Sequence, residues 1–467
     1  MMPALLAPPP PRDRMSTLGL AAATFFIVSG GPYGLEEIVL GYGYGGALAL
    51  LAVVPLVWSL PVALLVGELA AALPATGGYF AWVRRGLGPF WGLQEAWLSV
   101  AVGIVDIAIY PTLLVTYLGR LWPSLGGDQP GSRGWWLGIG AIVLCTAWNA
   151  AGIRSIGRGS AAFGAAVLAP FAVLVALAAW AATSGGLGAA RAAFAAPAAT
   201  DEGGLAAGLM LAMWNLMGFD NASTFASEVR RPERAYPRAM LVATAAIALS
   251  YLASVAAASA SGLAPAEWST GSWVEVGRRL GGPALGVTFG LVGGISAVGM
   301  YNALLLSWSR LPVALAEEGW LPAALARRDP RTGAPVAAVL LGGALSAVCV
   351  GLGLRRLVEL DVLLYGAALL LELLALVALR VREPELPRPF RIRGGLPVVL
   401  LLAALPASLL GVAAWQGRNE PGALGLSSLG LGAALAAVGP AWWVLTRVAL
   451  TPRPQGRAPR GRGTGAG

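Results

Sequence analysis

Histidine and lysine are missing from this sequence of 467 residues: it contains no histidine, and all 32 of its basic residues are arginines. Proton relays that use histidine or lysine are therefore excluded, and any proton chemistry falls to carboxylates. Charge is also scarce, because only 12% of the residues are charged while 57% are hydrophobic. A soluble protein carries about twice this fraction of charged residues. The composition therefore indicates an integral membrane protein.

Cysteine is nearly absent as well. The two cysteines, Cys145 and Cys349, lie inside apolar runs, where a thiol usually packs as a small hydrophobic group, and they predict neither a disulfide nor a metal site. Without a histidine base or a recognisable nucleophile constellation, an enzyme is the least favoured class, and we expect no cofactor. The net charge of +9 does not indicate nucleic-acid binding, because the arginines are spread between apolar runs instead of lying on one soluble face.

Apolar segments long enough to cross a bilayer, for which about 20 residues are needed, are abundant. We count about twelve, which predicts an all-α integral membrane protein. A cytoplasmic tail is expected at 1–16 and a disordered cytoplasmic tail at 448–467. Between them, the predicted spans are 17–42, 45–72, 90–119, 135–152, 160–183, 205–229, 238–262, 284–309, 335–353, 357–380, 396–415 and 425–447.

Arginine placement orients these spans. With the N-terminus inside, the cytoplasmic segments carry roughly three times as many arginines as the outer segments, as the positive-inside rule expects. An even number of spans leaves both ends in the cytoplasm. We therefore expect a multi-pass protein of the cell membrane, surrounded by lipid. The segment from Leu73 to Gly88 predicts a short interfacial helix on the cytoplasmic side.

Two of the predicted spans are interrupted. The span 17–42 contains Ser29, Gly30, Gly31, Pro32, Tyr33 and Gly34, and the span 205–229 contains the polar segment from Trp214 to Asn221. Proline removes a backbone donor and glycine weakens a helix, so the freed backbone groups would be very costly against lipid. Both breaks must face protein or water. Two broken spans at corresponding positions of two halves indicate a transporter with its site at the membrane midplane.

The third predicted span carries a polar stripe. Glu95, Ser99, Asp106 and Tyr110 follow one another at spacings of four, seven and four, so they share one face of a helix. At 1.5 Å per residue, Asp106 lies about 16 Å beyond Glu95, near mid-membrane. Because a carboxylate inside the membrane is costly, we expect Asp106 to be functional, with a structural hydrogen bond as the alternative. For Glu95, near the cytoplasmic mouth, the structural role is the favoured one.

Glu36 and Glu37 directly follow the first break. The half-helix that starts near Gly34 presents free N–H groups and a positive dipole end, which suits the carboxylate of an amino acid. Both glutamates lie in its first turn and would oppose that anion. Three interpretations stay open: an amino acid binds despite them, they attract a cationic amine, or they only cap the half-helix.

The second break offers aromatic, amide and acidic groups. Trp214 and Phe219 are candidates for contact with an alkyl chain or, through a cation–π interaction, with an amine, and plain packing is the alternative. Asp220 is the stronger candidate, because a charge beside a helix break needs a reason. Asn215 and Asn221 are expected to bind both unwound backbone and ligand.

Other polar residues of the spans carry weaker signals. Tyr301 in the eighth span is a candidate for one wall of the site, on its position alone. The remaining acids near span ends, for which we expect structural roles, are Glu68, Glu228, Glu359, Asp361 and Glu372.

Several of these motifs together resemble the amino acid–polyamine–organocation superfamily, over about residues 17 to 447. Within it, the chain is most similar to the branch of plant polyamine-uptake and L-type amino acid permeases. The motifs are Ser29 to Glu37, Pro74 to Tyr79, Gly88 to Gly92, Asp106 to Pro111, Trp214-Asn215 and Ser227-Glu228-Val229.

The resemblance implies a five-plus-five inverted repeat, at about 17–183 and 205–380, followed by two extra helices in 396–447. It also implies that Ser29 to Gly34 and Asn215 to Asn221 line the substrate site. Some relatives couple protons through a lysine in the fifth span, which this chain lacks. The eighth span also has fewer acids than the polyamine branch. A loop cysteine that tethers a partner subunit in some relatives is absent from 120–134, so no such partner is implied.

The sequence therefore predicts a secondary transporter that carries amino acids or polyamines, coupled to protons and working by alternating access. The alternatives are an exchanger of amino acids or amines, sodium coupling, a channel, and a nutrient sensor that does not transport. A channel would need a continuous polar lining, and a sensor usually carries a sizeable soluble domain.

Overall fold

The computed structural model describes residues 15–73, 78–152, 156–198, 202–222, 229–416, 418 and 425–450. Most of the N-terminal tail, Glu228 and the C-terminal tail from residue 451 lie outside the described residues. Within the described ranges the chain is helical and contains no β-strand, apart from one isolated bridge between Met15 and Val229. The all-α prediction is confirmed.

The first interrupted span is a pair of helices. α1 (Thr17–Ser29) ends at the break, and α2 (Glu36–Val54) begins after it. The sequence predicts a second span from residue 45, and the part of α2 that follows Gly43 continues through η1 (Pro55–Ser59) into α3 (Leu60–Ala72). Gly43, with φ 66° and ψ 177°, turns the chain there without a loop. The second interrupted span begins with α9 (Glu202–Trp214) and is irregular from Asn215.

The other predicted spans correspond in order to single helices. These are α5 (Pro89–Leu121), α6 (Arg133–Ala150), α7 (Ile156–Thr183), α10 (Pro232–Ala258), α11 (Trp273–Trp308), α13 (Val336–Cys349), α14 (Leu354–Arg382), α15 (Gly395–Gln416) and α16 (Ser428–Leu450). α11 consists of two helical parts that meet at a bend at Gly282 (φ 78°, ψ −177°), and the second part begins close to the start of the predicted span 284–309.

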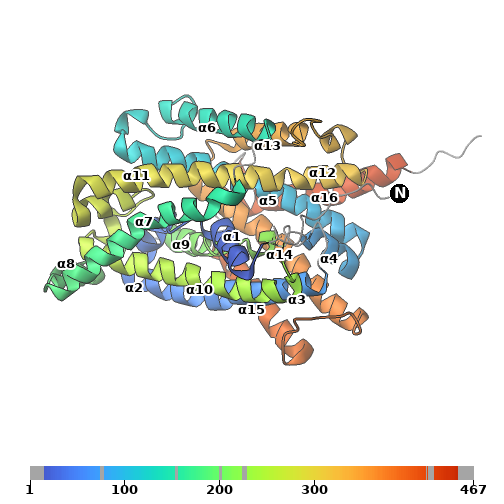
Figure 1. The fold of residues 1–467 in the computed structure, drawn as a ribbon, viewed down its shortest axis with the longest axis horizontal. Coiled ribbons are helices and arrows are strands. Elements are labelled where there is room, and N and C mark those ends of the chain that lie inside the picture. Colours follow the sequence, from blue (N-terminus) through green and yellow to red (C-terminus); the bar gives the residue numbers. More distant parts are fainter. Residues whose placement is uncertain are drawn as a thin grey trace, which may run out of the picture.

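Shorter helices connect the spans. α4 (Gly78–Leu87) occupies the segment where an interfacial helix is predicted, and α8 (Leu187–Ala195) lies near the opposite end of the molecule (Figure 1). The remaining short elements are α12 (Arg310–Glu317), η2 (Pro123–Leu125), η4 (Ser259–Ser261), η5 (Pro265–Glu267) and η6 (Ala323–Ala326).

The long helices lie side by side in one bundle (Figure 1). α5 packs against α11 and α14, α11 packs against α7, and α2 packs against α9. The predicted inverted repeat relates the third span to the eighth and the tenth span to the fifth. The contact between α5 and α14 is therefore equivalent to the contact between α11 and α7. α5, α9, α11 and α14 thus surround the two breaks.

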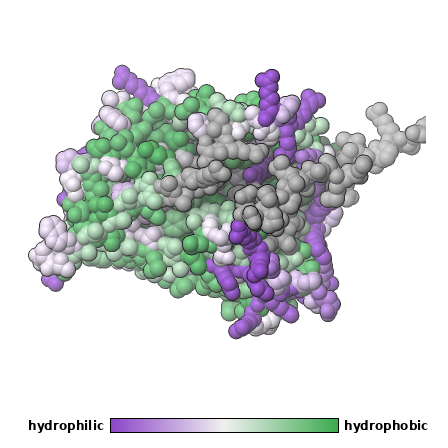
Figure 2. Space-filling model, viewed as in Figure 1, coloured by the Kyte–Doolittle hydropathy of each residue, from purple (hydrophilic) through white to green (hydrophobic). Residues whose placement is uncertain are grey.

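The surface of the bundle is apolar along its length. In Figure 2 a broad hydrophobic band covers the middle, and hydrophilic side chains gather toward the ends. Large apolar side chains of the long helices are exposed, such as Trp180 (71%) of α7 and Val348 (80%) of α13. Among the described residues, eight helical segments are long and apolar enough to cross a membrane. Such a surface is stable in lipid and not in water, so the chain is a multi-pass membrane protein.

Candidate functional site

The first break holds a strained backbone, and nearby side chains bind several of its freed polar groups. Gly30, Gly31 and Gly34 have φ values of 57°, 100° and 89°, which L side chains rarely adopt. The carbonyl of Gly30 accepts from Ser296 Oγ of α11 at 2.8 Å, and the carbonyl of Gly34 accepts from Asn215 Nδ2 at 3.2 Å. A Cβ at Gly34 would lie 3.0 Å from Trp214, so the two breaks touch.

The second break is held in the same way. The carbonyl of Leu216 accepts from Ser59 Oγ at 2.9 Å, and the N–H of Gly218 donates to the Tyr365 hydroxyl at 3.0 Å. The carbonyl of Ala222 accepts from the Tyr236 hydroxyl at 2.6 Å. Irregular backbone at membrane depth needs such protein partners, because lipid offers none. Side chains from η1, α10 and α14 therefore fix the shape of the second break.

A pocket lies between the two breaks and α5, α11 and α14. Half of the residues predicted for the site line it: Ser29, Gly30, Tyr33, Asp106, Tyr110, Trp214, Asn215 and Asn221. The sequence interpretation missed further lining residues, among them Tyr117, Met300 and Tyr365. The breaks and the polar stripe of α5 thus meet at one place.

The other predicted site residues lie beside the pocket without lining it. Gly31, Pro32 and Gly34 are buried in the turn of the first break, and Phe219 is fully buried in the core. Asp220 contacts the pocket indirectly, since its Oδ1 accepts from the Tyr365 hydroxyl. Tyr301 points to α13, where its hydroxyl lies 3.0 Å from Ser346 Oγ.

Glu36 occupies the N-terminus of α2. Its Oε2 accepts from the N–H of Gly34 at 2.8 Å, and its Oε1 accepts from the N–H of Gly271 at 3.0 Å and from the Tyr117 hydroxyl. Glu36 is fully buried. Its carboxylate therefore stands where the dipole end of the half-helix would otherwise hold an incoming anion. Glu37 is half-buried and accepts from Thr270 Oγ1 at 2.8 Å.

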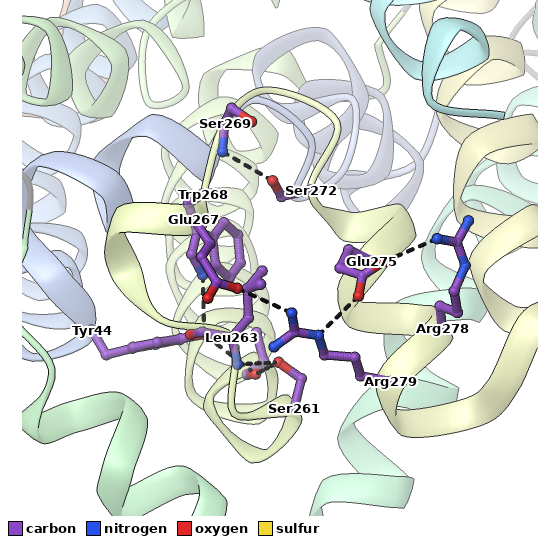
Figure 3. A network of polar contacts seen from close by, with 11 residues as sticks. Tyr44, Ser261, Leu263, Glu267, Trp268, Ser269, Ser272, Glu275, Arg278 and Arg279 are labelled. Carbon is purple, nitrogen blue, oxygen red and sulfur yellow. Dashed lines mark hydrogen bonds and ion pairs between the residues drawn. The ribbon is translucent and has the colours of Figure 1, made fainter. Parts of the chain in front are cut away.

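The segment between α10 and α11 that supplies Gly271 and Thr270 is held by its own polar network (Figure 3). The indole of Trp268 donates to the Tyr44 hydroxyl at 3.1 Å, and Arg279 binds both Glu267 and Glu275. Arg120 at the end of α5 also donates to the carbonyl of Thr270, at 3.0 Å. These contacts fix the segment over the end of the site at which α2 starts.

Acidic side chains of α5 and α14 face each other in the site. Asp106 of α5, which lines the pocket with Trp214, and Asp361 of α14 lie within charge–charge range, and both carboxylate oxygens of Asp361 are buried without a hydrogen-bond partner in the described part of the chain. The same indole ring lies 6.4 Å from the ring of Tyr110, between centroids. None of the ion pairs found among the described residues involves Asp106 or Asp361. Two carboxyl groups without an arginine partner among the described residues therefore lie close together at the site.

Not every buried acid of the spans belongs to this site. Glu68 pairs with Arg380 at 2.5 Å, and Glu359 pairs with Arg355 at 3.1 Å, so both have the structural role that the sequence predicts. Asp361 differs from them, because it forms none of the ion pairs found among the described residues and lies within charge–charge range of Asp106, although it does not line the pocket. Its spacing to Tyr365 and Glu372, of four and seven, repeats that of Glu95, Ser99 and Asp106 on α5. This repeated spacing was the signal in the sequence.

Known proteins resemble this chain over most of its length. Residues 20–424 match the family described as amino acid permease. The polyamine transporter PUT1 of Oryza sativa subsp. japonica is 30% identical over 431 residues, which cover 90% of this chain and 77% of the relative. A probable polyamine transporter of Arabidopsis thaliana is 33% identical over 410 residues, covering 86% and 82%. The polyamine transporter RMV1 of Arabidopsis thaliana is 30% identical over 413 residues, covering 85% and 80%.

The family match, the broken helices and the pocket between them lead to one conclusion. The chain belongs to the amino acid permease family within the amino acid–polyamine–organocation superfamily, and it is a membrane transporter and not an enzyme.

Proposed function

We propose that this transporter imports polyamines across the cell membrane in symport with protons. The observation that carries the proposal is the facing pair of Asp106 and Asp361 beside Trp214, without an arginine partner among the described residues. Buried carboxylates are costly unless a cation pairs with them. A substrate with an ammonium group supplies that cation, and the Trp214 and Tyr110 rings suit it through cation–π contact.

The position of Glu36 supports an amine without a carboxylate. An amino acid substrate needs a place for its carboxylate, and the N-terminus of α2 is the natural one. Glu36 already accepts the N–H of Gly34 there at 2.8 Å. The relatives named as polyamine transporters agree with this choice of substrate class.

Alternating access follows from the two breaks. We propose that the repeats, at about 17–183 and 205–380, carry the broken helices α1–α2 and α9 as a unit that rocks against α5 and α11. Both chain termini lie in the cytoplasm in this arrangement. Since the chain has no histidine or lysine, the coupling proton is carried by a carboxylate of the site.

The test uses two substrates that differ only in the carboxylate. Putrescine is ornithine without its α-carboxylate, so uptake of each labelled compound into proteoliposomes isolates the effect of that group. We expect uptake of putrescine that rises with an inward proton gradient, and no uptake of ornithine or leucine. If ornithine or leucine is transported and putrescine is not, the proposed substrate class is wrong. Uptake that needs internal amine in place of the gradient would establish exchange instead of symport.

A further inference from the structure

A second group of acids lies beside the pocket, nearer the predicted cytoplasmic side. It consists of Glu95 of α5, Asp220 of the second break and Glu372 of α14, which we call the inner acid cluster. Their exposed fractions are 0%, 5% and 2%. Each lies within charge–charge range of the other two. None of the ion pairs found among the described residues involves them.

Two oxygens of the inner acid cluster are buried without a hydrogen-bond partner in the described part of the chain. They are Oε2 of Glu95 and Oε2 of Glu372, whereas Oε1 of Glu95 accepts from Ser99 Oγ at 2.9 Å. Burying a polar atom without a hydrogen-bond partner costs free energy. An ionised carboxylate has no proton to donate, so only a donor group can satisfy these oxygens. An ammonium group brings three donors and the opposite charge.

The two acid groups stand at two levels of the same helix pair. Glu95 and Asp106 are eleven residues apart on α5, and Asp361 and Glu372 are eleven residues apart on α14. Asp106 faces Asp361 while Glu95 faces Glu372, so the two packed helices run in opposite directions. Eleven residues make three turns, so the levels lie about 16 Å apart.

Tyr365 lies between these levels. It lines the pocket, one turn along α14 from Asp361. Its hydroxyl donates to Asp220 Oδ1 at 2.5 Å and accepts from the N–H of Gly218 at 3.0 Å. The Tyr365 side chain therefore separates the pocket from the inner acid cluster. Moving this hydroxyl would join the two acid groups into one negatively charged path.

We propose that the inner acid cluster is a second ammonium-binding subsite, which holds one end of a long linear polyamine while the other end lies at Asp106 and Asp361. This proposal rests on the proposed function, polyamine transport, and adds how the two ends of a long substrate are bound. A four-carbon diamine is too short to reach both levels, whereas an extended tetraamine has about the length of the gap. Long polyamines therefore use both acid groups, and putrescine uses only the pocket.

The test compares putrescine and spermine on the purified full chain by titration calorimetry. The variants are Glu372→Gln and Glu95→Gln, which keep the side-chain shape and remove the charge. Glu359→Gln is the matched control, because it removes a buried carboxylate from α14 outside both acid groups. We expect each cluster variant to weaken spermine binding at least about tenfold and putrescine binding less than about twofold, as loss of a buried charge partner does.

Other outcomes separate the subsite from the proposed function. Equal weakening of both amines, or no weakening of either, overturns the second subsite and leaves polyamine transport standing. Unchanged spermine binding with loss of gradient dependence in proteoliposomes also overturns it, because the cluster would then carry the proton. If the unsubstituted protein binds neither putrescine nor spermine, the proposed function falls and the subsite falls with it.

Discussion

The hydroxyl of Tyr251 joins the two chain breaks, because it lies 3.0 Å from the carbonyl oxygen of Asn215 and 2.8 Å from Ser29 Oγ. The carbonyl only accepts, so it receives the tyrosine proton, and the Ser29 hydroxyl donates to Tyr251 in turn. Ser29 Oγ also accepts from the N–H of Gly31 at 3.1 Å. One side chain of α10 thus connects both breaks.

Tyr251→Phe is therefore expected to impair transport. The change keeps the ring but leaves the buried Asn215 carbonyl without this donor, at a cost of about 1–3 kcal/mol. The expected result is slower putrescine uptake together with a lower unfolding temperature in detergent. Tyr236→Phe is the control, since the Tyr236 hydroxyl donates to the second break, at the carbonyl of Ala222. If Tyr251→Phe affects uptake no more than Tyr236→Phe, the link between the breaks has no role in transport.

Asp106→Asn is expected to abolish amine binding without unfolding the protein. Asparagine keeps the shape but cannot pair with an ammonium group, and loss of a buried charge partner costs about 2–5 kcal/mol. The dissociation constant for putrescine should rise at least about 30-fold. Titration calorimetry measures it, and Asp128→Asn in an outer loop serves as the control. Unchanged affinity in the folded variant would remove Asp106 from the site.

Glu36→Gln is expected to destabilise the fold. Glutamine replaces one carboxylate oxygen by an NH2 group, which would face the N–H of Gly34 or of Gly271. The loss should be about 1–3 kcal/mol, seen as a lower unfolding temperature in detergent. Glu37→Gln should change it less, because Glu37 is half-buried and accepts one bond, from Thr270. Equal effects of the two variants would contradict this account of the α2 N-terminus.

Glu68→Gln is expected to be among the most destabilising changes of an acid outside the site. It leaves the buried guanidinium of Arg380, whose side chain is 4% exposed, without its charge partner. Breaking a buried ion pair in this way costs about 3–5 kcal/mol. Glu317→Gln is the control, since Glu317 and Arg328 form an exposed pair at 3.5 Å, a kind worth about 0–1 kcal/mol. Similar unfolding temperatures of the two variants would contradict the prediction.

The contact between Arg85 and Glu383 gives a pH dependence at the predicted cytoplasmic face. The Arg85 guanidinium, 2.7 Å from Glu383, holds the pKa of Glu383 below its ordinary value. A carboxylate whose pKa is lowered by folding stabilises the folded protein fully at pH values above its pKa in the unfolded chain. This stabilisation is lost as the pH falls through its pKa in the folded protein. Glu383→Gln should therefore lower the unfolding temperature slightly at neutral pH, and this difference should shrink as the pH falls below about 4. A difference that grows in acid would reverse the sign and refute the contact.

The sequence by itself determined the membrane class, the two breaks and the stripe of α5. Hydrophobic run length and the cost of freed backbone in lipid act locally, so they can be read along the chain. For the same reason Asp106, at mid-span, stood out as a candidate. The boundary between the first two spans was predicted at 42–45, where Gly43 lies, but the turn without a loop was not, because glycine permits a turn without requiring one.

Only the tertiary structure decided which acids belong together. Asp361 and Glu372 look in the sequence like Glu68 and Glu359, all four being single carboxylates in apolar helices. Packing of α14 on α5 places the first two opposite acids, whereas Arg380 and Arg355 lie beside the other two. Arg355 lies only four residues from Glu359, but Arg380 and the acids opposite Asp361 and Glu372 come from distant parts of the chain. The energy of a buried charge depends on such partners, so residue type and spacing alone do not fix its role.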